Sequence, residues 1–175
     1  MFFFKKFKSS PSVTPQPTAP IPPTQAIPPA PVTDTKIKKY KVTGTSHYTE
    51  NILTLASDNL DYKLTKKEMI NEGYENERIY KYEFYPLKTE LIPEPDNPYD
   101  PNAVKVIIDD VLVGYIKSGS CSHILKIIKE NRIVKITSEI GGGKYKYLGY
   151  DEDEDSYYLE NNDSPYFVLL SITEK

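Results

Sequence analysis

This chain has very few cysteines and histidines, the side chains that form disulfides and most often bind zinc. Its 175 residues include one cysteine, Cys121, and two histidines, His47 and His123. A disulfide within the chain is therefore excluded, and no second cluster completes the tetrahedral zinc site that Cys121 and His123 could begin. We predict structural roles for Cys121 and His123, no metal or other cofactor, and a reducing, cytoplasmic location.

The sequence also lacks long apolar runs and nucleotide-binding motifs. No run approaches the roughly 20 apolar residues that a membrane-spanning helix needs. The start, Met1-Phe-Phe-Phe, is too short for the apolar core of a signal peptide. A Gly-x-x-x-x-Gly-Lys-Ser/Thr phosphate loop is missing as well. These absences predict a protein without a membrane span and argue against ATP hydrolysis.

An excess of basic residues is absent too. The chain has 22 Lys and Arg against 25 Asp and Glu, a net charge of −3. The charges are unevenly spread: residues 1–39 hold six lysines and one acid, net +5, and the remainder holds 16 basic and 24 acidic residues, net −8. Non-specific DNA binding depends on neutralised phosphates. Any nucleic-acid role must therefore come from a local site.

Proline is abundant near the start of the chain. Residues 9–35 contain nine prolines among Ser, Thr, Gln and Ala, a composition that cannot bury a core. We predict a disordered tail over residues 1–38 and a folded domain over residues 39–175. The aromatic and basic start could anchor the tail to a membrane surface or an acidic partner, or it could be a frayed terminus. The prolines could dock a protein partner, although they lack the basic residues that usually orient such ligands.

Hydrophobic periodicity and turn signals predict mostly short strands in the folded domain. One helix should begin at a capping box formed by Thr65 and Glu68 and end by Gly73. A second helix, capped by Ser120 or Ser122, should reach about residue 131. The predicted fold class is mainly β, a small barrel of about six strands with two short helices. The expected strands cover residues 39–44, 79–85, 87–92, 104–108, 111–116, 133–140, 144–150, 156–159 and 166–172, with turns at residues 109–110 and 141–143.

The most informative segment is residues 94–103, Glu-Pro-Asp-Asn-Pro-Tyr-Asp-Pro-Asn-Ala. Its three prolines fix φ and remove backbone donors, so a helix is excluded here. Asn97 and Pro98 suit the first two positions of a type I turn. We therefore predict a stiff loop that presents Tyr99 and Asp100 and leads into a strand. A stiff loop loses little entropy when it binds a ligand.

This loop and its flanking strands resemble the HIRAN domain. The matching residues are Val42-Thr43-Gly44 with Tyr48, residues 94–106, and Val113-Gly114-Tyr115-Ile116. The resemblance spans residues 41–140, with an insertion at residues 58–88. It implies an OB-like β-barrel. HIRAN domains occur fused to helicase-like remodelling proteins, where they recognise DNA ends, notably the 3′-hydroxyl end of a single strand. They also occur as stand-alone bacterial and phage proteins.

The resemblance further implies which residues touch DNA. The Tyr-Asp of the Asn-Pro-Tyr-Asp loop would face the terminal nucleotide, and further contacts would come from residues after the first strand and after the hairpin glycine. At the position where the family has a basic residue, this chain has a serine. The later basic position falls near Lys117 or Ser118. The predicted nucleic-acid contacts are Ser46, His47, Tyr48, Asn97, Tyr99, Asp100, Tyr115 and Lys117.

These residues also have structural interpretations. Tyr99 could stack on a base or pack on the barrel. The Asp100 carboxylate could accept a hydrogen bond from a terminal hydroxyl, cap an Asx turn, or do both. His47 could stack on a base or be an ordinary surface histidine. The five acids at residues 151–155 could hold a catalytic metal, but such runs are more typical of a solvated loop.

We thus predict a non-enzymatic module that recognises single-stranded DNA ends, preferring a 3′-hydroxyl. The alternative is a protein-interaction module that keeps the HIRAN fold without binding DNA. The net charge of −8 after residue 39 and the serine at position 46 favour that alternative. An enzymatic role comes third.

Overall fold

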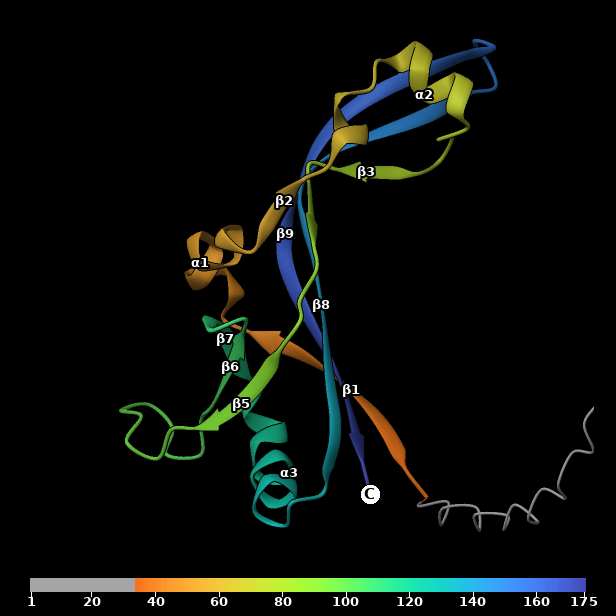
Figure 1. Cartoon of the computed structure of the whole chain (residues 1–175). Coiled ribbons are helices and arrows are strands. Elements are labelled where there is room, and N and C mark those ends of the chain that lie inside the picture. The colour runs from red at the N-terminus through yellow and green to blue at the C-terminus, as the bar shows by residue number, and fades with distance from the viewer. Residues whose placement is uncertain (1–33) are drawn as a thin grey trace, which may run out of the picture. The chain divides into compact units, whose positions relative to one another are not determined.

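Strands dominate residues 34–175, the part of the chain that the computed structural model describes (Figure 1). The strands are β1 (Lys36–Thr43), β2 (Ala56–Asp58), β3 (Arg78–Tyr80), β4 (Tyr82–Phe84), β5 (Thr89–Pro93), β6 (Val104–Ile108), β7 (Val111–Ile116), β8 (Ile133–Asp151) and β9 (Ser156–Glu174). The helices are α1 (Thr49–Thr54), α2 (Lys66–Glu72) and α3 (Ser118–Lys129), with 3₁₀ turns η1 (Thr45–Tyr48) and η2 (Leu60–Lys63).

Seven strands form one curled sheet in the order β3-β8-β9-β1-β7-β6-β5, a half-barrel that confirms the predicted mainly β, OB-like fold. Three α-helices accompany the sheet rather than the two predicted; the additional helix, α1, buries Ile52 against the main core. The N-terminal tail lies largely outside the described residues. Strand β1 begins at Lys36, before the expected domain start at residue 39, because its first residues pair with the end of β9.

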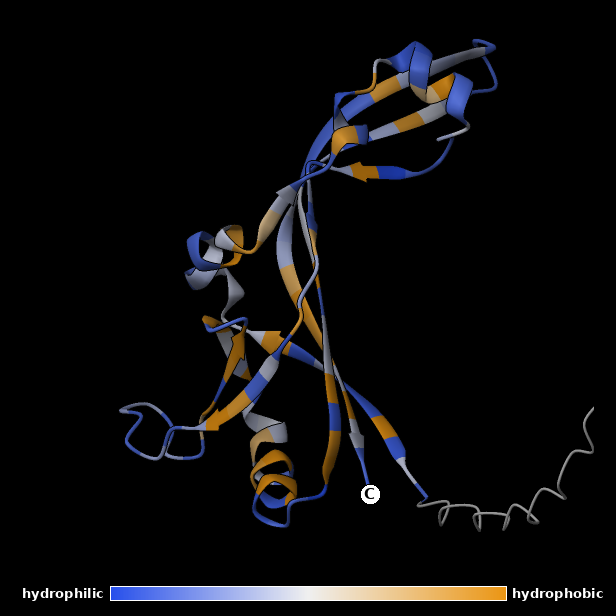
Figure 2. Cartoon of the chain, in the orientation of Figure 1, coloured by the Kyte–Doolittle hydropathy of each residue, from blue (hydrophilic) through white to orange (hydrophobic). Residues whose placement is uncertain are grey.

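The main core lies between the curled sheet and α3. Strand β6 alternates buried and half-buried residues, as expected for a strand with one face on a core. Helix α3 buries Cys121, Ile124 and Ile127 on one side, at helical spacing. These side chains meet Val168 and Leu170 of β9, and Figure 2 shows the corresponding apolar band along α3 and the lower strands. Helix α3 starts at Ser118, so the predicted cap at Ser120 or Ser122 is wrong.

Strands β8 and β9 form one long hairpin that runs the length of the described part (Figure 1). The prediction of four shorter strands with a turn at residues 141–143 is therefore wrong. The glycines form a β-bulge inside the hairpin instead, where Gly142 and Gly143 have φ of 104° and 84°. A Cβ on Gly142 would lie 2.3 Å from the carbonyl oxygen of Pro165. Glycine is needed here for close strand approach rather than for a chain reversal.

Beyond this bulge the hairpin carries a second, smaller core. We call residues 58–88 and 144–163 the arm. Met69 of α2, Ile79 of β3 and Leu148 of β8 are buried together in it. The insertion expected at residues 58–88 thus supplies α2 and β3 to the far half of the hairpin, and its end returns to the main core, where Phe84 packs and the Lys88 amide donates to Asp109. The capping box at Thr65 and Glu68 is confirmed. The single strand predicted over residues 79–85 is wrong, because β3 pairs with β8 while β4 pairs with β2.

No helix between residues 34 and 175 is both long and apolar enough to span a bilayer.

Candidate functional site

The loop at residues 94–103 is held by two backbone turns, each with proline at its second position. The Asn97 amide donates to the Glu94 carbonyl at 3.0 Å, and the Ala103 amide donates to the Asp100 carbonyl at 2.9 Å. Between them the expected turn at residues 97–100 is closed by a side chain. Asn97 Oδ1 accepts from the amides of Tyr99, at 3.0 Å, and Asp100, at 3.2 Å. The loop backbone is fixed before any ligand arrives.

This loop displays Tyr99 and Asp100 differently. Tyr99 is 95% exposed, so packing on the barrel, the structural interpretation of this residue, does not occur. Asp100 is half-buried, and its Oδ1 accepts from the Asn102 amide at 2.8 Å. This Asx turn uses one carboxylate oxygen. Asp100 therefore caps an Asx turn through Oδ1, and its Oδ2 can still accept a hydrogen bond from a ligand.

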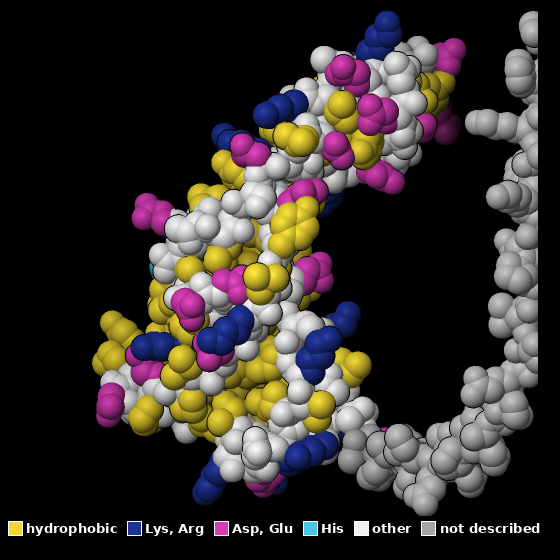
Figure 3. Space-filling model, viewed as in Figure 1, with side chains coloured by type: hydrophobic (Ala, Val, Ile, Leu, Met, Phe, Trp, Pro, Cys, Tyr) yellow, Lys and Arg dark blue, Asp and Glu magenta, His cyan; other side chains and the backbone are white. Residues whose placement is uncertain are grey.

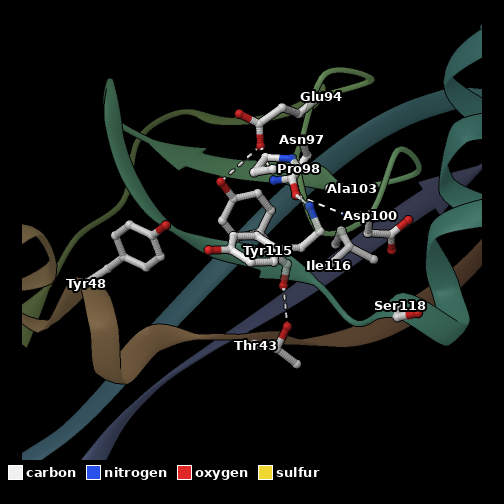
Figure 4. A pocket seen from close by; sticks show the side chains of 11 residues that line it. Thr43, Tyr48, Glu94, Asn97, Pro98, Asp100, Ala103, Tyr115, Ile116 and Ser118 are labelled. Carbon is white, nitrogen blue, oxygen red and sulfur yellow. Dashed lines mark hydrogen bonds between the residues drawn. The ribbon is translucent and has the colours of Figure 1, made fainter.

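An open pocket of about 480 Å³ lies beside the loop (Figure 4). Its walls come from the end of β1, η1, the loop, β7 and the start of α3. In Figure 4 the carboxylate of Asp100 lies on the side of the pocket nearest α3, where Ser118 begins the helix. Five of the eight predicted contacts line this pocket: Tyr48, Asn97, Tyr99, Asp100 and Tyr115.

The other three predicted contacts lie elsewhere. Ser46 lines a separate hollow of about 400 Å³ with Asp163 and Tyr166. His47 is exposed, and its backbone amide closes η1 on the Gly44 carbonyl at 2.9 Å. Lys117 is exposed at the residue before α3. The resemblance thus groups residues that the fold divides between two hollows and the adjoining surface.

Glu94 organises the polar side of the pocket. Its Oε2 accepts from Asn97 Nδ2 at 2.7 Å and from the Tyr115 hydroxyl at 3.1 Å, and its Oε1 pairs with Lys105 Nζ at 2.5 Å. The bonds from Lys105 and then Asn97 hold the pKa of Glu94 below its ordinary value. Sequence reasoning named Glu94 only as the first residue of the loop. Lys105 and Tyr115, the two partners of Glu94, lie opposite each other on β6 and β7, and this register could have pointed to Glu94.

Two tyrosines give the pocket its aromatic surface. The rings of Tyr48 and Tyr115 lie 6.2 Å apart between centroids and tilt by 48°. Burial, followed by the nearby Tyr48 hydroxyl and Glu94 carboxylate, raises the pKa of Tyr115. Tyr115 therefore stays neutral and donates to Glu94. The pocket combines aromatic faces, a fixed carboxylate and an oriented hydroxyl.

The remaining candidates from the sequence have structural partners. Cys121 is buried, donates from Sγ to the Ile116 carbonyl at 3.5 Å, and has a pKa raised by burial. His123 Nε2 lies 3.3 Å from Glu174. In the loop at residues 151–155, Asp151 Oδ1 accepts from the Asp153 amide at 2.9 Å. Among residues 34–175, no three His, Cys, Asp or Glu side chains gather as metal ligands would.

Comparison of the chain with protein-family models, curated proteins and solved structures finds no match. The resemblance to the HIRAN domain accordingly stays a prediction.

Proposed function

We propose that this protein binds single-stranded DNA ends and receives a 3′-hydroxyl terminus in the pocket beside the loop at residues 94–103. The observation that carries the proposal is the convergence of Tyr48, Tyr99 and Tyr115 with Asp100 around one open pocket. The role is binding without chemistry.

Each group has a defined part in this proposal. The exposed ring of Tyr99 stacks on a base, an interaction that contributes about 1–3 kcal/mol per base. The fixed turns around Tyr99 reduce the entropy lost on binding. Asp100 accepts a hydrogen bond from the terminal hydroxyl. A terminal phosphate meets the same carboxylate as a like charge and is disfavoured.

The charge distribution is compatible with a DNA site on this half of the molecule. The arm holds 8 basic and 14 acidic residues, net −6. The rest of residues 34–175 holds 11 of each, net 0. Figure 3 shows several acidic side chains over the arm, with others spread among basic side chains on the rest of the visible face. The acidic excess that argues against DNA binding therefore belongs mainly to the arm rather than to the pocket half.

A protein-interaction module is the second candidate, and the lining of the pocket favours it. None of the described residues that line the pocket is Lys or Arg, while Glu94 and Asp100 are both acidic. An exposed aromatic such as Tyr99 is also typical of protein interfaces. This alternative keeps the pocket as a docking site for a protein segment.

Fluorescence anisotropy separates the two candidates. A 5′-labelled single-stranded oligonucleotide with a free 3′-hydroxyl is titrated with the protein at low and moderate salt. Unlabelled linear strand should then displace it, whereas a circular strand of the same sequence, which has no end, should compete poorly. Equal competition by the circle would contradict end recognition. No binding even at low salt would favour the protein-interaction module.

A further inference from the structure

We propose that the strand leaves the pocket along the exposed side of α3, where Lys126 and Lys129 contact phosphates on the 5′ side of the bound end. This inference rests on the proposed function, since it places the 3′ terminus at Asp100. It adds a second contact region and the cations that the pocket lacks.

A further hollow, which we call the α3 hollow, lies along α3 and shares structural elements with the pocket. It has a volume of about 580 Å³ and is lined by Asn102, Ser122, Leu125, Lys126, Lys129 and Glu130. The pocket and the α3 hollow share two structural elements. Asp100 and Asn102 belong to the same turn; Asp100 lines the pocket and Asn102 lines the α3 hollow. On α3, Ser118 lines the pocket, and Ser122, one helical turn later, lines the α3 hollow.

The side of α3 that faces away from the core carries polar and basic residues along this path. Cys121, Ile124 and Ile127 point into the core. Ser118, Ser122, Lys126 and Lys129 follow one another at spacings of four, four and three residues, which places them along one outer stripe. Lys126 is 65% exposed and lies 4.0 Å from Glu130, a distance that leaves its ammonium able to pair with a phosphate.

The stripe also has a suitable length. Ser118 and Lys129 are 11 residues apart on the helix, a rise of about 16 Å at 1.5 Å per residue. A stacked strand advances about 3.4 Å per nucleotide. Lys126, about 12 Å along the helix, and Lys129 would thus meet phosphates about three to five nucleotides from the 3′ end. Leu125, half-buried between them, offers an apolar surface to a base.

Oligonucleotide length provides the test. A double variant, Lys126→Ala with Lys129→Ala, is compared with a control that removes the same charge from exposed lysines elsewhere, Lys36→Ala with Lys135→Ala. Binding of 5′-labelled trinucleotides and decanucleotides with free 3′-hydroxyls is measured over a range of salt, and circular dichroism verifies the fold of each variant.

For the decanucleotide, the double variant should lower the slope of log K against log salt by about 1.4, which is two contacts at about 0.7 each on single strands. Trinucleotide affinity and the preference for a 3′-hydroxyl over a 3′-phosphate should not change, and the control should behave as wild type. An unchanged decanucleotide slope with intact end preference would overturn this inference alone.

Two other outcomes would contradict the proposed function or the DNA path. If wild type binds neither oligonucleotide, the proposed function and the path along α3 fail together. If the double variant loses binding to polyglutamate while decanucleotide binding is unaffected, the α3 hollow takes an acidic protein segment, and the proposed DNA path is wrong.

Discussion

The exposed ring of Tyr99 is proposed to stack on a base, and its contribution to binding can be measured. Tyr99→Ala should weaken binding of single strands by about 1–3 kcal/mol, because the stacking surface is lost. Strands ending in hydroxyl and in phosphate should be affected equally, since stacking does not involve the terminal group. Tyr85→Ala is the matched control, because Tyr85 is 66% exposed on a different surface. Equal loss in both variants would indicate a non-specific effect.

Glu94 gives a pH-dependent prediction. Its pKa is lowered in the folded protein, chiefly by Lys105, so its contribution to stability is present above the ordinary value of 4.5. That contribution is lost as the pH falls through the lower folded value. Glu94→Gln should therefore be less stable than wild type at neutral pH, and this difference should shrink on acidification.

Urea unfolding of both proteins across this pH range measures the effect. Glu139→Gln, at an exposed position on β8, is the control and should follow wild type throughout. A Glu94→Gln deficit that stays constant to acid pH would contradict the assigned role of the Lys105 pair.

Residue identity alone predicted part of the pocket. Tyr99 and Asp100 could be selected because their loop is one continuous proline-rich segment. The Asn97 side chain could also be expected to close a turn. Glu94 could not be selected in this way, because its partners Lys105 and Tyr115 meet it only through the register of β6 and β7. Ser46 shows the opposite error: the resemblance groups it with Tyr48, but the two residues line different hollows.

At the scale of elements, the contact between β1 and β7 supports one wall of the pocket. Gly114 has φ of 149°, and a Cβ there would lie 2.5 Å from the Thr43 carbonyl oxygen. Gly114→Ala should force β1 away from β7 and cost about 1–3 kcal/mol of stability. Because Thr43 and Tyr115 line the pocket, DNA affinity should fall as well.

Gly119→Ala is the matched control for this change. A Cβ at Gly119 has no neighbour within 4 Å, and alanine favours a helix by up to about 1 kcal/mol. Thermal unfolding should therefore show destabilisation for the first variant and none for the second. A stable Gly114→Ala variant would contradict the close strand contact.

The sequence predicted those element ends that are set by residues within a few positions of each other. The capping box at Thr65 and the turn between β6 and β7 are examples. Asp109 and Asp110 adopt φ of 47° and 67°, values that aspartate tolerates better than most residues. The long hairpin could not be predicted in the same way. Glycines signal a turn in sequence, and only the packing of Pro165 and Tyr166 against residues 142–143 makes them a bulge.

In the whole molecule, the main core and the core of the arm are expected to unfold separately. Met69 is completely buried in the arm, so Met69→Ala should cost about 2–5 kcal/mol there. Hydrogen exchange should show lost protection in α2, β3 and the far half of the hairpin, with protection retained in β6 and α3. DNA binding should be nearly unchanged, because the pocket lies outside the arm.

Ile124→Ala provides the comparison, since Ile124 is completely buried in the main core. It should reduce protection in β6 and α3 and weaken DNA binding. If Met69→Ala lowers protection uniformly across residues 34–175, the two cores unfold as one cooperative unit and the arm is not separable.

Recognition of a 3′-hydroxyl end by Asp100 can be measured by comparing two strands that differ only in that group. A hydrogen bond to a charged group contributes roughly 1.5–3 kcal/mol, so a 3′-hydroxyl strand should bind at least about tenfold more tightly than its 3′-phosphate counterpart. Asp100→Asn should narrow this ratio, because the amide still accepts but no longer repels the phosphate. Equal wild-type affinity for the two strands would show that Asp100 does not recognise the terminal hydroxyl.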